Sequence, residues 1–379
     1  MVRRLAFLIT ILTSLTLLVV SCGQQNVSST PTPLASAAPT SPVPSVAETP
    51  QSPQEVTPVT SPSPTVTPQN TVTASPTPAA TEVPVSGSSE NGYPFTYTDA
   101  TGHKVTLKSQ PRRIVSLFPS NNETVFAIGA GDQVIAVDQF TNYPKEAAEK
   151  PKIKGTYQKF NIEQIVSLKP DLVLSSLGAE QIIDKPLRDA GITVINTGYP
   201  GTIDQVVKHI RDLGRITGHT EEADKIAYQL ESTVKQVESK TSKLPKVRVY
   251  FESDVSTPGK PYTYGAGSLV DQMITIAGGR NIFGNVKNPF PQVSYESIVR
   301  RNPQVIILGD VKGFVGPDFL NPTTVEEVKS REGFSTIEAV KKNRVVPVNP
   351  DLYTTPGPRL TQAIKQLAAI IHPEVFGER

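Results

Sequence analysis

Short apolar runs recur through residues 114–348 and alternate with segments that have the periodicity of helices. The runs lie at 114–117, 134–137, 172–174, 192–195, 247–251, 305–308 and 345–348. Strands that alternate with helices in this way favour parallel sheets with helices on both faces. An alternating segment at 95–107, with a turn at 99–103, predicts a hairpin before the first of these strands.

The longest helical pattern lies at 220–242, between the fourth and the fifth apolar run. Glu221 and Glu222 fall in its first turn, where they complement the helix dipole. Its apolar positions follow helical spacing and are Ala223, Ile226, Ala227, Leu230, Val234 and Val237. A helix of about 20 residues is about 30 Å long. We therefore expect a stiff connection between two lobes that permits only small closure motions.

These patterns predict an α/β fold with two Rossmann-like lobes, each a parallel sheet flanked by helices, joined by one long interdomain helix. The folded part holds about 285 residues, enough for two medium domains. The expected boundaries are 1–22 for a signal peptide, 23–92 for a disordered linker, 93–215 for the N-terminal lobe, 216–244 for the connecting helix and 245–379 for the C-terminal lobe.

One segment occurs twice in the chain, 133 positions apart. The first copy begins at Asn161 and carries Glu163, and the second begins at Ser294 and carries Glu296. In each copy a capping residue starts a short helix, the glutamate lies in the first turn, and a proline ends the helix before a buried strand. Two similar halves imply two similar lobes with a cleft between them, where ligands tend to bind.

The N-terminus has the features of an export signal. Arg3 and Arg4 precede an apolar stretch at 5–20, which is short for a membrane-spanning helix, and residues 19–22 match the lipobox pattern that ends in Cys22. Cleavage before Cys22 would place a lipid on the new N-terminus and leave no other cysteine for disulfides or metals. We expect an extracytoplasmic lipoprotein, anchored to the outer side of the cell membrane at the cell surface or in a periplasm.

Residues 24–89 are dominated by Pro, Thr, Ser, Ala and Val and contain no Lys or Arg. Such a composition cannot form a packed core. Extended as polyproline II, the segment would reach about 200 Å, and as a flexible coil about a quarter of that length. We expect a spacer between the lipid and the lobes. The alternative is that the segment has no role of its own.

Charge and motif content argue against several classes of function. The net formal charge is +2, and no basic stripe with interleaved aromatics is present, so we expect no nucleic-acid partner. The four histidines lack the spacing of metal ligands, and we expect no metal and no cofactor. No nucleophile elbow occurs, and residues 129–131 lack the third glycine of a dinucleotide loop. We expect a protein without catalytic residues; a surface-anchored hydrolase that uses paired acids, or an adhesin, is the alternative.

Several blocks, in the same order, resemble the periplasmic iron-siderophore and cobalamin binding proteins of ABC importers. The blocks are 113–123, Tyr143-Pro144, 161–163 and 168–173 in the first half, and 265–268, 277–281, 291–296 and Pro358-Arg359 in the second. The resemblance spans nearly all of residues 112–371. It implies two Rossmann-like lobes joined by a single long helix, and an ABC permease with its ATPase as partners. We expect the protein itself to be a monomer.

In the family that this chain resembles, one glutamate on each lobe meets arginine-bearing pockets on the two permease subunits. Glu163 and Glu296 fall at the matching positions. A first-turn glutamate projects into solvent, and paired charges that lie far apart fix orientation and speed encounter. Each carboxylate could instead only complement its helix dipole, which is worth about 0.3–1 kcal/mol. The duplication at equivalent places favours the docking role.

The same resemblance indicates where the ligand would bind. Positions that contact cobalamin in the family fall on Phe140, Tyr157, Phe290 and Asp351, and beside them we place Ser120, Asn121 and Tyr353. Corrinoids are broad, amphipathic and fringed with amides, so aromatic walls and a few hydrogen-bonding groups suit them. Two positions that are tryptophan in close cobalamin binders are tyrosine and phenylalanine here, and Thr355 stands where a basic residue is expected.

A corrinoid is the favoured ligand, and two other chelates stay open. Ferric siderophore complexes are often anionic, and their binders commonly place arginines in the cleft. Arg359 follows a proline at a predicted helix start and is expected to be structural. A ferric siderophore is therefore the first alternative, and haem, held through a tyrosine ligand, is another.

Overall fold

The structure is a computed structural model that describes residues 92–156, 159–255, 257–311 and 323–377. The predicted signal peptide with Cys22, nearly all of the predicted linker and the candidate ligand residue Tyr157 lie outside these ranges. Within them, no helix combines the length and the apolar character needed to cross a bilayer.

The N-terminal lobe is built on a parallel sheet with the strand order β5-β4-β3-β8-β9. Its strands are β3 (Ile114–Ser116), β4 (Val134–Asp138), β5 (Lys152–Ile153), β8 (Leu172–Ser175) and β9 (Val194–Asn196). Its helices are α2 (Pro119–Ala127), α3 (Lys145–Ala148), α4 (Ile162–Ser167), α5 (Lys185–Asp189) and α6 (Ile203–Thr217). Successive residues of β3 point to opposite faces of the sheet, so Ile114 packs with α2 and α6 whereas Val115 packs with α4 and α5.

Two short antiparallel hairpins extend this lobe. The first pairs β1 (Phe95–Thr98) with β2 (Lys104–Leu107), as the alternation at 95–107 predicts. The second pairs β6 (Gly155–Thr156) with β7 (Lys159–Phe160) and leads directly into α4.

The C-terminal lobe repeats this plan. Its sheet has the order β11-β10-β13-β14, with β12 also paired to β10, and only β11 runs antiparallel. The strands are β10 (Val247–Asp254), β11 (Tyr262–Thr263), β12 (Gly279–Asn281), β13 (Val305–Leu308) and β14 (Val345–Pro347). The helices are α8 (Leu269–Ile276), α9 (Tyr295–Arg301), α10 (Val325–Ser330), α11 (Glu338–Lys341), α12 (Pro350–Thr354), α13 (Leu360–Ile371) and α14 (Pro373–Phe376). Each of the predicted apolar runs overlaps a strand of one sheet or the other, and the α/β fold class is confirmed.

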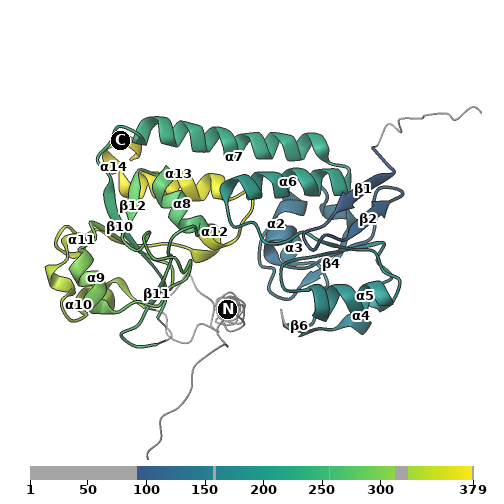
Figure 1. Ribbon diagram of the computed structural model, residues 1–379, viewed down its shortest axis with the longest axis horizontal. Helices are drawn as coiled ribbons and strands as arrows, with labels where there is room; N and C mark the ends of the chain where they lie inside the picture. The colour runs from purple at the N-terminus through teal and green to yellow at the C-terminus, as the bar shows by residue number, and fades with distance from the viewer. Residues whose placement is uncertain (1–91, 157–158, 256, 312–322, 378–379) are drawn as a thin grey trace, which may run out of the picture. The chain divides into compact units, whose positions relative to one another are not determined.

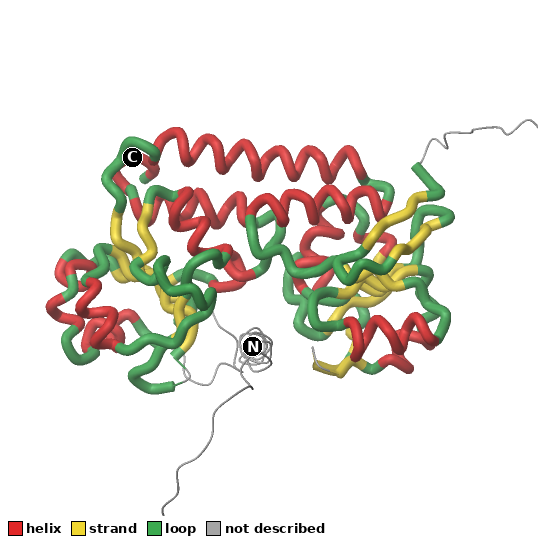
Figure 2. Tube along the Cα trace, viewed as in Figure 1, coloured by secondary structure: helices red, strands yellow, loops and turns green. Residues whose placement is uncertain are grey.

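Helix α7 (Thr220–Thr241) connects the lobes and has 22 residues, about 33 Å of helix. Glu221 and Glu222 lie in its first turn, and the face that carries Ala223 and Leu230 is buried. Figures 1 and 2 show α7 lying alongside α6 and α13. One apolar core runs from the first sheet through these three helices to the second sheet, which favours a stiff connection between the lobes.

The two copies of the duplicated segment make equivalent contacts with their sheets. Lys169 and Asn302, 133 positions apart, each adopt a positive φ, 48° and 45°, directly before a proline. In each lobe an arginine at the start of the first sheet strand donates its Nε to the carbonyl oxygen of that residue: Arg113 to Lys169 at 3.2 Å and Arg248 to Asn302 at 2.8 Å. Helices α4 and α9, with their glutamates, are therefore fixed to their sheets in the same way.

Candidate functional site

Ser120 and Asn121 lie in the first turn of α2, directly after β3, and both are buried. The Asn121 amide donates to the carbonyl oxygens of Leu117 and Ser175, both at 3.0 Å, and its carbonyl oxygen accepts from the Thr197 hydroxyl at 2.8 Å. These bonds tie the carboxyl ends of three adjacent strands together. In this structure Asn121 is therefore a support for the edge of the sheet and is not open to a ligand.

Phe140 follows β4 and is half-buried against the core beneath α4 and α5. Its loop is held by Asp138, whose carboxylate accepts from the Phe140 amide at 2.8 Å and from the Thr141 hydroxyl at 2.6 Å. Asn122 of α2 donates to the same carboxylate at 2.8 Å. The loop at the end of β4 is thus fixed before any ligand arrives.

Phe290 and Tyr353, the aromatic candidates of the C-terminal lobe, are linked through Tyr264 and Phe251 by edge-to-face contacts. Phe290 packs on Tyr264 with ring centroids 5.8 Å apart, Tyr264 on Phe251 at 5.3 Å, and Phe251 on Tyr353 at 5.4 Å. Only Phe290 is half-buried; the other three rings are buried. Tyr353 donates its hydroxyl to Gln366 and has no exposed surface, so it supports the wall rather than forming its outer face.

Asp351 lies in the first turn of α12 and is partly exposed. Its carboxylate accepts a hydrogen bond of 2.8 Å from the Asn142 side chain, which belongs to the other lobe. The structure therefore brings Asp351 close to the loop that carries Phe140. Phe290 lies on a separate loop, after β12.

One contact between the lobes was not predicted from the sequence. Glu123 of α2 is 2% exposed and pairs with Arg359, which precedes α13, at 2.8 Å. Burial raises the pKa of the Glu123 carboxyl above its usual value, although the hydrogen bonds and the charge of Arg359 oppose this. The expectation that Arg359 is structural fits this ion pair, but its partner, 236 positions away in sequence, gave no local signal.

A second unexpected cluster lies at the carboxyl ends of β10 and β13. Glu252 is fully buried and accepts hydrogen bonds from Arg331 at 2.7 Å and from the Tyr250 hydroxyl at 3.0 Å. Asp310 lies nearby and accepts from the Thr323 hydroxyl at 3.1 Å. Burial, together with the charge of Glu252, raises the pKa of Asp310 to about 8. Glu252 is thus paired with the Arg331 guanidinium, whereas Asp310, beside the charge of Glu252, retains a proton at neutral pH.

The two duplicated glutamates occupy matching positions in their lobes. Glu163 lies in the first turn of α4, capped by the Asn161 side chain, and Glu296 lies in the first turn of α9, capped by Ser294. Both side chains are exposed. Glu296 has Arg300 of its own helix at 3.8 Å, which is a weak, solvent-screened contact.

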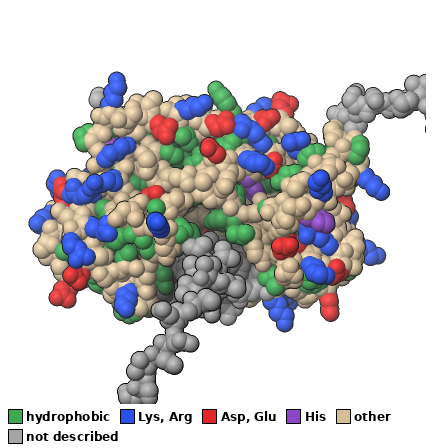
Figure 3. All heavy atoms as spheres, viewed as in Figure 1, with side chains coloured by type: hydrophobic (Ala, Val, Ile, Leu, Met, Phe, Trp, Pro, Cys, Tyr) green, Lys and Arg blue, Asp and Glu red, His purple; other side chains and the backbone are tan. Residues whose placement is uncertain are grey.

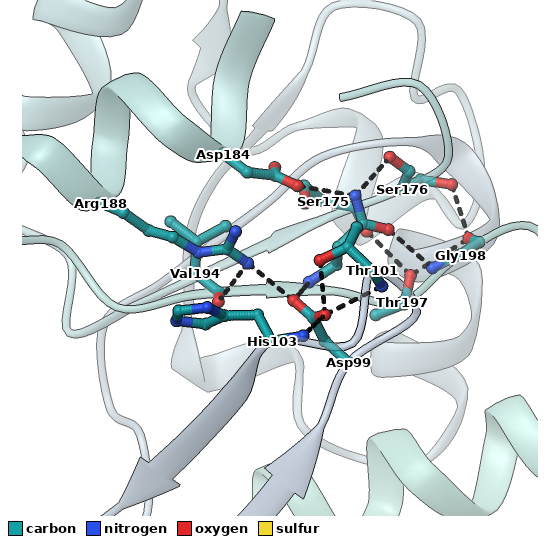
Figure 4. A network of polar contacts seen from close by, with 11 residues as sticks. Asp99, Thr101, His103, Ser175, Ser176, Asp184, Arg188, Val194, Thr197 and Gly198 are labelled. Atoms are coloured by element: carbon teal, nitrogen blue, oxygen red, sulfur yellow. Dashed lines mark hydrogen bonds and ion pairs between the residues drawn. The ribbon is translucent and has the colours of Figure 1, made fainter. Parts of the chain in front are cut away.

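A buried polar network holds the first hairpin to the carboxyl ends of β8 and β9 (Figure 4). The Asp99 carboxylate accepts from the amide and the hydroxyl of Thr101 at 2.9 and 2.7 Å and from the His103 amide at 2.9 Å. Its other oxygen accepts from Arg188 at 2.7 Å and from the Asn196 amide at 3.2 Å. Burial alone would raise the pKa of Asp99, but these hydrogen bonds outweigh it and hold the pKa below its usual value.

We predict that Asp99→Asn destabilises the protein by about 2 kcal/mol at pH 7, because it removes charge-assisted hydrogen bonds from a buried group. The pKa of Asp99 is lowered on folding, so its contribution is present above the unfolded value of 3.8 and is lost as the pH falls through the folded pKa. Urea denaturation at pH 7 and at pH 3 measures this. If the variant's loss in free energy of unfolding were as large at pH 3 as at pH 7, the prediction would be wrong.

Charged side chains are intermixed over the surface. Figure 3 shows Lys and Arg beside Asp and Glu across the face in view. A hollow of about 500 Å³ between α6 and α7 is lined by such pairs, including Arg211 with Glu231 at 3.0 Å and with Asp224 at 3.2 Å. Its charges neutralise one another, so this hollow does not resemble a chelate site. Among the described residues, no group of three or more His, Cys, Asp and Glu is arranged to hold a metal ion.

Two α/β lobes with matching folds, in contact at the carboxyl ends of their strands and joined by one helix, define a two-lobed binding protein. A model of the periplasmic binding protein family matches residues 114–352, and the chain belongs to this family. It is 35% identical over 292 residues to an uncharacterized ABC transporter substrate-binding lipoprotein, YvrC of Bacillus subtilis, with 76% of this chain and 88% of the relative covered. This chain is accordingly a substrate-binding protein of an ABC importer, a class that acts outside the cytoplasm.

Two further similarities are to proteins whose names indicate what they bind. The chain is 30% identical over 285 residues to a cobalamin-binding protein of Halobacterium salinarum, and the match covers 74% of each chain. A solved structure of a possible iron-binding, periplasmic solute-binding protein from Staphylococcus epidermidis superposes with a TM-score of 0.59 at 29% identity, and covers 70% of this chain and 100% of that one.

Proposed function

We propose that this protein captures a corrinoid between its lobes and delivers it to an ABC permease that is driven by an ATPase. The observation that carries the choice of ligand is that three arginines of the two lobes are already paired with buried carboxylates. Arg188, Arg331 and Arg359 are each paired with a buried carboxylate, that of Asp99, Glu252 and Glu123 respectively.

An arginine that is already paired with a buried carboxylate is a poor partner for an anionic ligand. Removing it from its carboxylate would leave that group buried and uncompensated, which costs about 3–5 kcal/mol. Phe140, Phe290 and Asp351, which are half-buried or partly exposed, instead offer aromatic surface and one hydrogen-bond acceptor. A broad ligand fringed with amides is compatible with such a surface, and similarity to a cobalamin-binding relative supports this choice.

Capture requires no chemistry, and we propose that the protein is not an enzyme. Binding of the ligand would involve the loops of both lobes, with Tyr157 joining from outside the described residues. Ser120, Asn121 and Tyr353 are buried here, so we assign them the role of supporting the site.

We further propose that Glu163 and Glu296 dock the loaded protein on the permease. Their exposure, their matching caps and the identical attachment of α4 and α9 to the two sheets support this role. Two charges on rigid, separate lobes set the orientation of approach, since a partner must satisfy both at once.

The N-terminal segments complete the proposal. Cleavage of residues 1–22, lipidation of Cys22 and a spacer at 23–92 would tether the lobes, 93–215 and 245–379, to the outer side of the membrane as a monomer. Similarity to a relative that is named a lipoprotein supports the anchor.

Titration of the full-length protein with a panel of chelates tests the ligand. The panel is cyanocobalamin, a ferric hydroxamate, a ferric catecholate and haem, each followed by isothermal calorimetry. We expect cyanocobalamin to bind with a Kd of about 1 µM or tighter. Tight binding of another member with none of cyanocobalamin would overturn the corrinoid assignment.

A ferric siderophore is the second candidate. The similarity to the possible iron-binding protein of Staphylococcus epidermidis favours it, as does the absence of tryptophan from the chain. The ferric complexes in the panel decide between the two.

A further inference from the structure

Several contacts between the lobes involve residues 351–359 of the C-terminal lobe, which we call the seam segment. Asp351 accepts from Asn142 at 2.8 Å, and the carbonyl oxygen of Thr354 accepts from the Tyr199 hydroxyl at 3.1 Å. Arg359, at the other end of the segment, pairs with Glu123. The segment that carries the candidate ligand residue Asp351 therefore also helps to fix the distance between the lobes, together with Gln272 of α8, which contacts Gly201 and Ile203.

The Glu123–Arg359 pair is the most strongly fixed of these contacts. Arg359 donates its Nε and its backbone amide to the two oxygens of the carboxylate, at 2.8 and 3.1 Å, so the guanidinium and the chain are held together. Both side chains are largely buried, 17% and 2% exposed. Gly357 permits this approach, because a Cβ there would lie 3.0 Å from the Glu123 Oε1.

The guanidinium of Arg359 also lies over the ring of Tyr143, 4.0 Å from its centroid. A cation at this distance is attracted to the face of the ring. Because Arg359 is fixed by Glu123, the orientation of the Tyr143 ring is fixed as well. The ring is nevertheless 44% exposed, and its neighbour Asn142 is the residue that contacts Asp351.

We propose that Tyr143 is a further ligand-contacting residue, and that Glu123 and Arg359 are positioning residues that hold its ring at the seam between the lobes. The inference rests on the proposed function, since it places the ligand between the lobes. A fixed aromatic ring loses little entropy when a ligand covers it, and its hydroxyl can bond to an amide. The ligand surface it suits is broad and apolar with amides at its rim.

Binding by variants tests the contact. Tyr143→Ala should weaken binding of cyanocobalamin roughly 10- to 100-fold, as removal of a central aromatic anchor does, and Tyr143→Phe should weaken it only a few-fold. Tyr228→Ala is the matched control, because Tyr228 is 67% exposed on α7 and should leave the affinity unchanged. Wild-type affinity in Tyr143→Ala would overturn the contact.

The positioning role needs a readout that does not depend on a ligand. Nitration of tyrosines by tetranitromethane, followed by mass spectrometry, reports how open each ring is. In Glu123→Gln and Arg359→Lys, Tyr143 should react about twofold faster, since the covered face is released, while Tyr228 should not change. A merely structural role would lower the thermal midpoint of these variants and leave the nitration rate of Tyr143 at the wild-type value.

The two proposals fail in different ways. If cyanocobalamin does not bind the wild-type protein but another member of the panel does, the corrinoid assignment fails and the Tyr143 variants are judged with that ligand. If cyanocobalamin binds equally well to wild type and Tyr143→Ala, the ligand assignment stands and the inference fails. If no member of the panel binds, both fail.

Discussion

Replacing both Glu163 and Glu296 with alanine should abolish transport while ligand affinity stays at the wild-type value. Both carboxylates are exposed at helix starts, one on each lobe, and within the described residues no hydrogen bond or ion pair joins either of them to Phe140, Phe290 or Asp351. Removing one should lower uptake partially, and removing both should lower it by at least roughly tenfold, because orientation on the permease needs both charges. Uptake of radiolabelled cyanocobalamin by cells that carry the variant as their sole copy measures this.

A matched control separates docking from a general effect of charge. Glu221→Ala with Glu326→Ala removes the same two charges from exposed first-turn positions of α7 and α10. This control should transport at the wild-type rate. Unchanged uptake in the Glu163 and Glu296 double variant, or an equal loss in the control, would refute the docking role.

Asp310→Asn should stabilise the protein, and the gain should grow as the pH rises from about 4 to about 8. The pKa of Asp310 is raised on folding from 3.8 to about 8, so the folded state binds a proton that the unfolded state has released. The free energy of unfolding therefore falls with rising pH across this range, by up to about 1.4 kcal/mol per pH unit. Asparagine does not titrate, so the variant does not lose free energy of unfolding in this way as the pH rises.

Urea denaturation from pH 4 to pH 9 measures the effect. The gain in free energy of unfolding from Asp310→Asn should be near zero at pH 4. It should be constant above about pH 8, because burial and the charge of Glu252 raise the pKa of Asp310 to about 8. Glu326→Gln, at an exposed carboxylate of α10, is the control and should show no such trend. If the stabilisation by Asp310→Asn did not depend on pH, or if the variant were less stable than the wild type at pH 8, Asp310 would not be the titrating group of the cluster.

Much of the fold could be predicted from the order of apolar positions. A buried parallel strand is a short apolar run and a connecting helix has its own period, so the strands and α7 were found in the sequence. The short strands β5, β6, β7, β11 and β12 were not, because their residues do not form an apolar run. The duplicated segments also predicted the matching positions of Glu163 and Glu296 in the two lobes.

The candidate site was predicted less completely, because sequence position does not say which way a side chain points. Tyr353 and Asn121 follow strands in the expected way, but both face the interior. Glu252 lies just after an apolar run, and nothing near it marks Arg331 as its partner. The pair of Glu123 and Arg359 joins positions 236 apart, which only the folded chain brings together.

Hydrogen–deuterium exchange of the full-length protein, with and without cyanocobalamin, tests most directly that the ligand lies between the lobes. We expect protection of the loop after β4, which carries Phe140 and Tyr143, together with the loop and helix after β14, which carry Asp351. Protection in one lobe alone, or confined to α6 and α7, would contradict it.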